Sequence, residues 1–474
     1  MTNDNALVWL RRDLRLHDHH ALFQACENSK NVYLAFVFDE HILDKLPKAD
    51  MRLTFIHDAL TEMEESLEKK QASIHILHGC PIEEIPKLCK KLKVNHVYTN
   101  RDYEPYAVDR DHKVAAALEE QDVNFSTYKD TVFFEQGEIE TKTGGPYKVY
   151  TPYKNRWYEK FNEQDGALSD YKPKLKNLAE FENKNSITQL DWHKKLGFKR
   201  TEPSLKAGTK EAKRRLTLFG NDIQDYNEAR DFPAMEKTSN MSPYIRHGNL
   251  SVRDLLRAGM EGKSNGHKIW TSEVIWREFY QQILAEFPHV RKGAFRKEYD
   301  SIKWAGGKKE FDAWTQGQTG YPLVDAAMRC LNETGLMHNR LRMVVASFLC
   351  KTLLVNWQKG EAYFAEKLLD FDLAANNGGW QWSASSGTDA QPYFRIFNPY
   401  SQSAKFDKEG EYIKKWCPEL SGFKGKKIHD PSTADMIEQS EANCTIGVDY
   451  PFPVVNYKEK REEALAMYKK ALKS

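Results

Sequence analysis

The first third of the chain alternates short apolar runs with stretches of helical periodicity. The apolar runs lie at residues 6–10, 32–38, 74–77 and 96–98, and they are rich in β-branched residues, as buried parallel strands are. Between the second and third runs, apolar residues recur at helical spacing and form one stripe: Leu53, Ile56, Leu60, Met63 and Leu67. This alternation predicts a doubly wound, Rossmann-like α/β domain over residues 1–133.

The pattern changes twice after this region. From 134 to 204 the periodicity dissolves into Lys, Asn, Gly and Pro, as in Thr143-Gly144-Gly145-Pro146, which predicts a long connector over the surface. From 205 to 474 helical periodicity dominates. The sequence therefore predicts an α/β domain, a linker over 134–204 and an all-α domain over 205–474.

Composition narrows the class of protein. The chain has 474 residues, of which 40% are hydrophobic and 29% are charged, so it can bury more than one core and is not disordered. Its net charge of +2 lacks the basic excess of a histone-like protein, which leaves nucleic-acid binding open. The first twenty residues include Arg11, Asp13 and Arg15, and no apolar run approaches the roughly 18 residues that span a bilayer. We expect a cytoplasmic protein that does not enter a membrane.

Cysteine and tryptophan usage give two further indications. The seven cysteines are scattered and never spaced as C-x-x-C, so we expect reduced thiols and no metal site. Seven of the eleven tryptophans lie between Trp270 and Trp382, and this density needs an explanation.

The usual nucleotide-binding motifs do not account for that region. Gly262-Lys263-Ser264 resembles the end of a phosphate-binding loop, but Arg257 stands where the motif requires glycine. No strand-to-helix junction of the α/β domain carries G-x-G-x-x-G. A bound dinucleotide must therefore lie outside the predicted sheet.

Two stretches of the helical region carry candidate chemistry. Residues 238–243 place hydroxyls and Ser242, a predicted N-cap, before Pro243; such helix starts bind phosphate, although ordinary capping accounts for the same pattern. Residues 270–280 read as a helix with four polar and aromatic side chains on one face: Glu273, Trp276, Arg277 and Tyr280. Such a face is poor core material because buried charges need partners, although a solvated amphipathic face is the alternative.

Five longer segments resemble a known family. They are 9–15 (Trp-Leu-Arg-Arg-Asp-Leu-Arg), 319–329, 337–343, 370–382 and 393–399. Together they are similar to class I cyclobutane pyrimidine dimer photolyases of the photolyase and cryptochrome family, over nearly the whole chain and most densely from 226 to 416. The resemblance implies an α/β antenna domain, a linker, and a helical domain that encloses FAD near a DNA-binding cavity.

The resemblance also implies roles for individual residues around FAD. Asn376 would face N5 of the flavin ring, and Arg342 and Asp370 would form an ion pair against it, for which a surface bridge is the alternative. The remaining cofactor contacts would come from Tyr226, Thr238, Ser239, Asn240, Met241, Ser242, Trp270, Glu273, Arg277, Asn339, Phe371 and Asp372.

For DNA, the resemblance implies a flipped pyrimidine dimer that stacks on aromatic side chains close to the flavin. Trp276 and Trp382 would form that aromatic wedge, Met343 its apolar floor, and Glu273 would hydrogen-bond the pyrimidine edge and steady its radical anion. The flanking phosphates would bind four arginines: Arg230, Arg277, Arg340 and Arg395.

Three tryptophans would carry electrons from the surface to photoexcited flavin by similarity to the family: Trp380, Trp357 and Trp304. Core packing is the ordinary role of a tryptophan in a helical domain, and only the family match distinguishes these three.

A second, antenna chromophore is also implied. Residues 100–105 followed by Arg110 resemble family members that bind a deazaflavin (8-HDF), whereas Ala107 stands where folate-binding relatives tend to carry Glu. We expect deazaflavin, with methenyltetrahydrofolate (MTHF) as the second possibility.

Two functions on the same fold compete with repair of cyclobutane dimers. A cryptochrome photoreceptor is disfavoured by Asn376 in place of an acid, by the Glu273, Trp276 and Met343 set, and by the lack of a long extension after the helical region. A (6-4) photolyase is disfavoured because His338-Asn339 stands where those enzymes have a His pair. The sequence departs from the family pattern at Leu336, where Trp is usual, and at Phe371, where Gly is usual. Neither difference removes a reacting group. The expected partner is ultraviolet-damaged DNA, bound by a monomer without an obligate protein partner.

Overall fold

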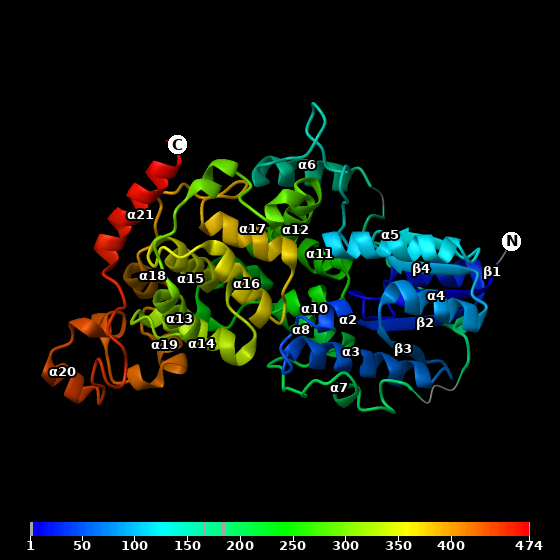
Figure 1. Cartoon of the computed structure of the whole chain (residues 1–474), viewed down its shortest axis with the longest axis horizontal. Coiled ribbons are helices and arrows are strands. Elements are labelled where there is room, and N and C mark those ends of the chain that lie inside the picture. Colours follow the sequence, from blue (N-terminus) through cyan, green and yellow to red (C-terminus); the bar gives the residue numbers. More distant parts are fainter. Residues whose placement is uncertain (1–2, 165, 182–184, 474) are drawn as a thin grey trace. The chain divides into compact units, whose positions relative to one another are not determined.

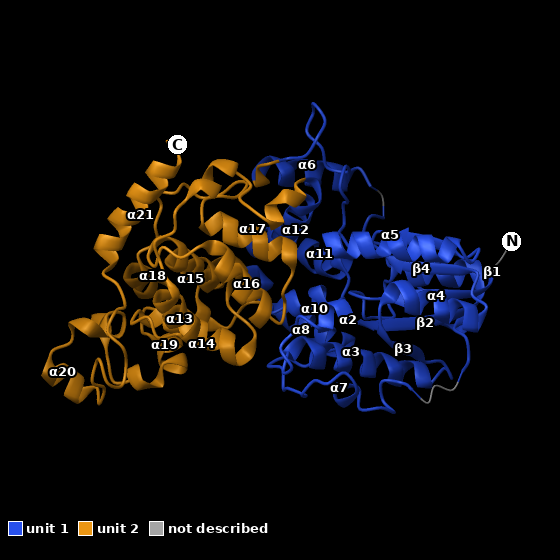
Figure 2. Ribbon diagram, viewed as in Figure 1, with its two compact units in different colours: residues 1–147, 151–224, 239–286 blue, residues 148–150, 225–238, 287–474 orange. Residues whose placement is uncertain are grey.

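The computed structural model describes residues 3–164, 166–181 and 185–473, so the predicted outer ends Met1 and Ser474 lie outside the described residues. The chain forms two compact units (Figure 2). Unit 1 comprises residues 1–147, 151–224 and 239–286, and unit 2 comprises residues 148–150, 225–238 and 287–474.

Unit 1 contains a parallel five-stranded sheet (Figure 1), whose strand order is β3-β2-β1-β4-β5. Its strands are β1 (Asn3–Leu10), β2 (Ser29–Asp39), β3 (Ile74–Gly79), β4 (His96–Asn100) and β5 (Asn124–Tyr128). The four predicted strands are confirmed. The apolar pattern does not predict β5, because this edge strand is short, largely polar and only half-buried.

Both faces of the sheet are buried. Along β1, Ala6, Val8 and Leu10 enter the core on one face, while Leu7 and Trp9 enter a second core on the other. The first core includes residues of α1 (His20–Asn28) and α3 (Met51–Glu68), and the second includes residues of α4 (Pro81–Leu92) and α5 (Pro105–Glu119). The predicted doubly wound arrangement is therefore confirmed, and the predicted stripe from Leu53 to Leu67 is α3.

Unit 1 extends well beyond the sheet. Its other helices are α2 (Glu40–Leu43), α6 (Tyr150–Asn162), α7 (Trp192–Lys195), α8 (Thr209–Asp222), α10 (Ser242–Arg246), α11 (Val252–Met260) and α12 (Asn265–Glu286). Two of them, α6 and α7, fall in the predicted linker. The units also differ from the predicted boundaries, because residues 239–286 belong to the same compact unit as the sheet. The division into antenna, linker and catalytic domains stays a prediction about function.

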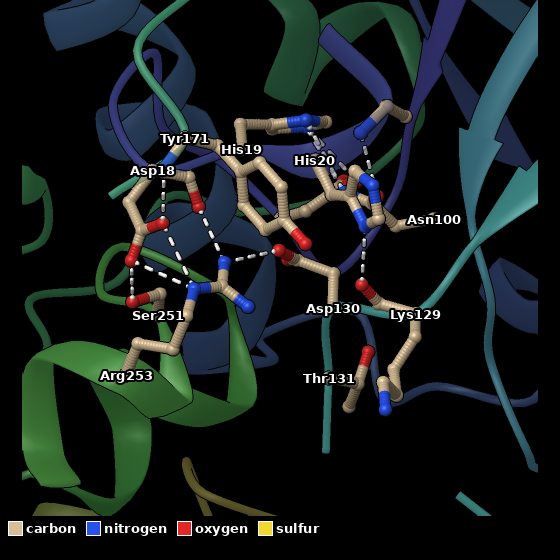
Figure 3. Close-up of polar contacts among 12 residues, drawn as sticks. Asp18, His19, His20, Asn100, Lys129, Asp130, Thr131, Tyr171, Ser251 and Arg253 are labelled. Atoms are coloured by element: carbon tan, nitrogen blue, oxygen red, sulfur yellow. Dashed lines mark hydrogen bonds and ion pairs between the residues drawn. The ribbon is translucent and has the colours of Figure 1, made fainter. Parts of the chain in front are cut away.

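A buried ionic network ties α11 to the sheet (Figure 3). Arg253 donates from Nε to Asp18 at 2.9 Å and from Nη2 to Asp130 at 2.8 Å, and Arg15 donates to the other oxygen of Asp130 at 2.5 Å. Ser251, the N-cap of α11, donates to Asp18 at 2.5 Å. Asp18 lies in the segment between β1 and α1, and Asp130 follows β5, so the start of α11 is fixed against two loops of unit 1. Paired in this way, the buried charges satisfy one another.

Unit 2 is helical. Its helices are α9 (Tyr226–Ala229), α13 (Lys308–Gln316), α14 (Pro322–Thr334), α15 (Asn339–Lys351), α16 (Trp357–Lys367), α17 (Leu373–Ser383), α18 (Pro399–Phe406), α19 (Glu411–Trp416), α20 (Met436–Glu441) and α21 (Tyr457–Ala471). Its core centres on α14 and α15, with Trp314, Trp357 and Trp380 packed into it. Within the described ranges, no helix is both long enough and apolar enough to cross a bilayer.

Candidate active site

The predicted site residues divide between the two units. Ser239, Asn240, Met241, Ser242, Trp270, Glu273, Trp276 and Arg277 belong to unit 1. Unit 2 holds the others: Tyr226, Arg230, Thr238, Trp304, Asn339, Arg340, Arg342, Met343, Trp357, Asp370, Phe371, Asp372, Asn376, Trp380, Trp382 and Arg395.

In unit 1, helix α12 presents the predicted polar and aromatic face. Glu273, Trp276, Arg277 and Tyr280 are all half-buried, whereas Val274, Ile275 and Phe279 between them are buried. The Trp276 ring centroid lies 5.6 Å from that of Tyr280. The predicted helix and its shared face are confirmed. The face offers a carboxylate, an indole and a guanidinium within two helical turns.

Contacts of two neighbouring residues, Glu278 and Arg277, fix the rotation of this helix. The fully buried Glu278 accepts hydrogen bonds from the Phe133 N–H and from Trp157 Nε1, both at 2.6 Å, and burial raises the pKa of Glu278 to about 7. Arg277 donates from Nη1 to the Thr131 carbonyl oxygen at 2.8 Å. The rotation of α12 about its axis is thus set by residues 131–133, which leaves the half-buried face in a fixed direction.

The segment that contains Ser242 begins a helix one residue earlier than predicted. Met241 is the N-cap, without a side-chain capping bond, and Ser242 is the first residue of α10, which spans Ser242–Arg246. The predicted N-cap is therefore wrong by one position. Asn240 has φ of +53°, a left-handed conformation that an Asn side chain tolerates, and the Met241 N–H donates to Ser239 Oγ at 3.3 Å.

In unit 2, the predicted ion pair between Arg342 and Asp370 is confirmed. Arg342 Nη2 donates to Asp370 Oδ2 at 2.8 Å, and its Nε donates to the Met337 carbonyl oxygen at 2.9 Å. The Asp370 side chain is only 3% exposed, and its Oδ1 has no hydrogen-bond partner among the described residues. An acceptor that is buried and unsatisfied fits a ligand with N–H or O–H donors, as FAD has.

Asn376 lies on α17 in contact with a residue that the sequence does not single out. Asn376 Nδ2 donates to the Glu361 carbonyl oxygen at 3.0 Å, and the neighbouring Asn377 donates to Glu361 Oε1 at 2.8 Å. Burial raises the pKa of the Glu361 carboxyl to about 7. The Asn376 amide keeps its Oδ1 and a second Nδ2 hydrogen for other partners. The only sequence signal for this contact is Gly360, a glycine inside a helix.

The three predicted relay tryptophans differ in burial. Trp380 is 2% and Trp357 is 4% exposed, whereas Trp304 is half-buried and packs edge-on against Tyr468 at 6.2 Å. The ring centroid of Trp380 lies 5.0 Å from that of Phe364 and 6.0 Å from that of Trp314. Neither of these two rings is singled out by the sequence pattern. The gradient in exposure is compatible with the predicted relay, whose order stays a prediction.

The residues predicted to bind DNA in unit 2 occupy varied surroundings. Arg395 is exposed, Met343 and Trp382 are half-buried, and Asn339, a predicted cofactor contact, is exposed at the start of α15. Arg340 pairs with Asp231 at 2.7 Å, and the Arg230 guanidinium lies 5.5 Å from the Tyr226 ring centre. The Arg340 charge is therefore partly neutralised, while Arg395 faces solvent.

A second polar cluster lies at the carboxyl ends of the central strands, where α/β proteins of this kind bind ligands. Arg12 pairs with Asp102 at 3.0 Å and with Glu104 at 2.9 Å, both from the segment predicted to hold the antenna chromophore. Tyr106 donates to Asp39 at 2.7 Å, and the Arg110 guanidinium lies 5.6 Å from the Tyr106 ring. Flat rings and paired charges at this strand edge suit a planar, polar chromophore.

Comparison with known proteins gives a family match for each of two parts of the chain. Residues 6–174 match the family model described as DNA photolyase, and residues 270–470 match the FAD binding domain of DNA photolyase. The deoxyribodipyrimidine photo-lyase of Vibrio cholerae is 38% identical, over 98% of this chain and 99% of its own length.

Solved structures show the same fold. A bacterial class III photolyase from Agrobacterium tumefaciens has a TM-score of 0.91 and 33% identity, and the match covers 100% of this chain and 99% of that one. A cryptochrome from Synechocystis has a TM-score of 0.87 and 25% identity, covering 98% of this chain and 99% of that one. With a relative of this identity along nearly its whole length, the chain belongs to the DNA photolyase family and carries the FAD-binding domain of that family.

Proposed function

We propose that the chain is a deoxyribodipyrimidine photo-lyase, which uses FAD and blue or near-ultraviolet light to split cyclobutane pyrimidine dimers in DNA. The observation that carries the proposal is the half-buried face of α12, where Glu273, Trp276 and Arg277 lie together. A flat pyrimidine dimer flanked by phosphates offers a stacking surface, hydrogen-bonding edges and negative charge. These three side chains match those three features.

In this proposal the binding residues have separate tasks. Trp276 and Trp382 stack against the flipped lesion, Met343 supplies an adaptable apolar surface, and Glu273 hydrogen-bonds the pyrimidine edge. The flanking phosphates contact Arg230, Arg277, Arg340 and Arg395.

FAD is held chiefly by the buried polar residues of unit 2. Asp370 would accept from the cofactor through Oδ1 while Arg342 donates to its Oδ2, and Asn376 would present its side-chain amide to the flavin ring. Contacts from Tyr226, Thr238, Trp270, Asn339, Phe371, Asp372 and the 239–242 segment complete the set. Bound there, reduced FAD would supply the chemistry of light-driven one-electron transfer to the dimer. The protein itself binds and orients FAD and the dimer, and it excludes water from them.

The direct test is illumination of the reduced protein with dimer-containing DNA. Recovery of pyrimidine absorbance that requires both light and reduced flavin is the expected result. The matched control is Glu273→Gln, which keeps the size and hydrogen-bonding capacity of the side chain and removes its charge; it should bind the lesion and repair it more slowly. Flavin loading without any light-dependent recovery would contradict the proposal.

A cryptochrome photoreceptor is the second candidate, favoured by the likeness to the Synechocystis structure. It would respond to light without repair, so the same illumination experiment separates the two.

A (6-4) photolyase is the third candidate, and substrate DNA with (6-4) photoproducts tests it. In this chain His338 caps α15 by accepting from the Arg340 N–H at 3.2 Å, which engages one ring nitrogen. The assignment to class I is likewise a proposal, beside the likeness to a class III structure.

For the antenna chromophore we propose deazaflavin, with methenyltetrahydrofolate as the second candidate. The support is the strand-edge cluster of Arg12, Asp102, Glu104 and Arg110. Reconstitution of the purified protein with each compound, followed by absorption and by energy transfer to FAD, distinguishes them. Binding of folate alone would contradict the first choice.

We further propose that the protein acts as a cytoplasmic monomer that reaches the nucleoid through DNA binding. Analytical ultracentrifugation with and without dimer-containing DNA tests the oligomeric state, and a stable dimer in the absence of DNA would contradict it.

A further inference from the structure

Lys351 is a fully buried lysine at the end of α15. Its exposure is 0%, and among the ion pairs of the described residues none includes it. Its Nζ donates instead to two neutral acceptors, Ser385 Oγ at 2.9 Å and the Arg395 carbonyl oxygen at 3.2 Å. Lysine is almost never fully buried without a charged partner.

This burial carries an energetic cost that core packing does not explain. An ammonium group loses its hydration when buried, and the pKa of Lys351 falls to about 7 for that reason. Methionine would fill a similar volume without the cost. What lysine provides here and methionine does not is therefore the pair of hydrogen bonds that its Nζ donates.

Those two groups are the ends of one loop. Ser385 and Arg395 bracket the turn-rich segment between α17 and α18, so a single Nζ closes the segment at both ends. Ser385 has φ of +64° and Asp389 has φ of +45°, conformations that need outside support in residues other than glycine. The loop ends in exposed Phe394 and Arg395.

Helix α21 supports the same loop from the other side. Tyr468 donates to the Ala384 carbonyl oxygen at 2.9 Å, its ring stacks on Tyr393 at 5.8 Å, and Lys351 Nζ lies 5.9 Å from the centre of the Tyr468 ring. Lys351 thus lies in a small buried assembly with Ser385 and Tyr468 that holds the backbone at both ends of the segment.

We propose that Lys351 is a positioning residue for DNA binding: by holding both ends of the 385–395 loop, it sets the backbone from which Arg395 reaches a phosphate. The inference rests on the proposed function, in which Arg395 contacts DNA. Lys351 itself touches neither DNA nor FAD.

The test combines Lys351→Met with Arg395→Ala. Binding of dimer-containing duplex is measured by fluorescence anisotropy between about 50 and 200 mM salt. We expect Lys351→Met to weaken binding about tenfold and to reduce the salt slope by about one, as Arg395→Ala does, because both lose the same phosphate contact. The double variant should bind no more weakly than either single variant, since the two changes act on one interaction.

Two further variants sharpen the result. Lys359→Met removes an exposed lysine of unit 2 and should leave affinity and salt slope unchanged. Ser385→Ala removes only one of the two acceptors and keeps the lysine, so it should weaken binding by about threefold and show the same lack of additivity with Arg395→Ala. This variant carries the test if Lys351→Met does not fold. Flavin content and thermal unfolding are measured for each.

The outcomes distinguish a failure of the proposed function from a failure of the positioning role of Lys351. If wild type fails to prefer dimer-containing DNA, the proposed function fails. If wild type shows that preference and Arg395→Ala weakens binding, but folded Lys351→Met and Ser385→Ala bind with wild-type affinity and slope, the positioning role is overturned alone. Losses that multiply in the double variant would also overturn it.

Discussion

Asn376 is the uncharged residue that we propose faces the flavin ring. Its Nδ2 is engaged by the Glu361 carbonyl, and the Glu361 carboxyl itself lies within reach of Asn377. A carboxylate at position 376 would stand close to the proposed flavin ring, and like charges disfavour each other's ionised form.

We therefore expect Asn376→Asp to retain FAD and lesion binding but to disfavour the anionic, fully reduced flavin by charge repulsion. Repair should fall unless a strong reductant is supplied. The measurement is the flavin reduction potential at matched pH, with Asn376→Gln as the uncharged control. An unchanged potential together with unchanged repair would make Asn376 a packing residue.

Glu278 predicts a pH dependence of stability. Its pKa is raised from 4.5 to about 7 by burial, so between these values the folded protein keeps a proton that the unfolded chain has released. The stabilisation is complete below the lower value and is lost as the pH rises through the upper one. Glu361 acts in the same direction.

We expect the free energy of unfolding to fall across this window by up to about 1.4 kcal/mol per pH unit for each such group. Glu278→Gln should make the slope shallower, whereas Glu333→Gln, at an exposed position, should not. Denaturant unfolding at several pH values measures this. If wild type and Glu278→Gln show equal slopes, a group other than Glu278 keeps the proton in the folded protein.

At the scale of single elements, the packing of α16 against α17 depends on Gly360. A Cβ added at Gly360 would lie 2.1 Å from Cη2 of Trp380, closer than any real contact, so the indole occupies the space that a side chain would need. Glycine in a helix interior is unfavourable by about 1 kcal/mol relative to alanine, and here the tight contact offsets that cost.

Gly360→Ala should therefore destabilise the protein by about 1–2 kcal/mol, the overpacking penalty less the gain in helix propensity, and should perturb the near-ultraviolet circular dichroism of Trp380. Gly220→Ala in α8 is the matched control, because its added Cβ meets nothing within 4 Å. It should be neutral or stabilising. A stabilised Gly360→Ala would mean that Trp380 shifts without cost.

The predicted relay is tested through Trp304, the half-buried member of the three. Trp304→Phe should block photoreduction of oxidised flavin, because phenylalanine packs similarly but is far harder to oxidise. Repair by chemically reduced enzyme should survive. Trp416→Phe, another half-buried indole of unit 2, serves as control. Normal photoreduction in Trp304→Phe would show that a different surface residue ends the relay.

What the sequence predicts, and what it does not, follows from the strength of local patterns. Buried strands such as β1 and β2 are continuous apolar runs and are found at once, whereas the half-exposed β5 leaves little signal. The Arg342–Asp370 pair is found only through the family resemblance, since its partners lie 28 residues apart. Glu361 is missed because its contact with Asn377 is tertiary, and the placement of residues 239–286 in unit 1 is missed because it also rests on tertiary contacts, such as those of Arg253.

At the scale of the whole molecule, DNA affinity and lesion selectivity should be separable. Arg395→Ala should weaken binding to damaged and undamaged DNA alike and reduce the salt slope by about one, because it removes a phosphate contact. Trp276→Ala should instead reduce the preference for damaged DNA, because stacking stabilises only the flipped lesion. Competition binding with matched damaged and undamaged duplexes measures both. Equal salt slopes in wild type and Arg395→Ala would remove Arg395 from the phosphate contacts.

The network around Arg253 also bears on how the protein is made. During synthesis the strands and residues 1–224 leave the ribosome before α11 exists, so Asp18 lacks Arg253 and Ser251 at that stage. Unit 1 can reach its final packing only after residue 286 has emerged, by which time residues 225–238, which belong to unit 2, have been synthesised as well. A nascent chain halted near residue 224 should therefore be protease-sensitive and should engage chaperones. A gene divided at that point should give an N-terminal fragment that folds only when the segment 239–286 is supplied in trans.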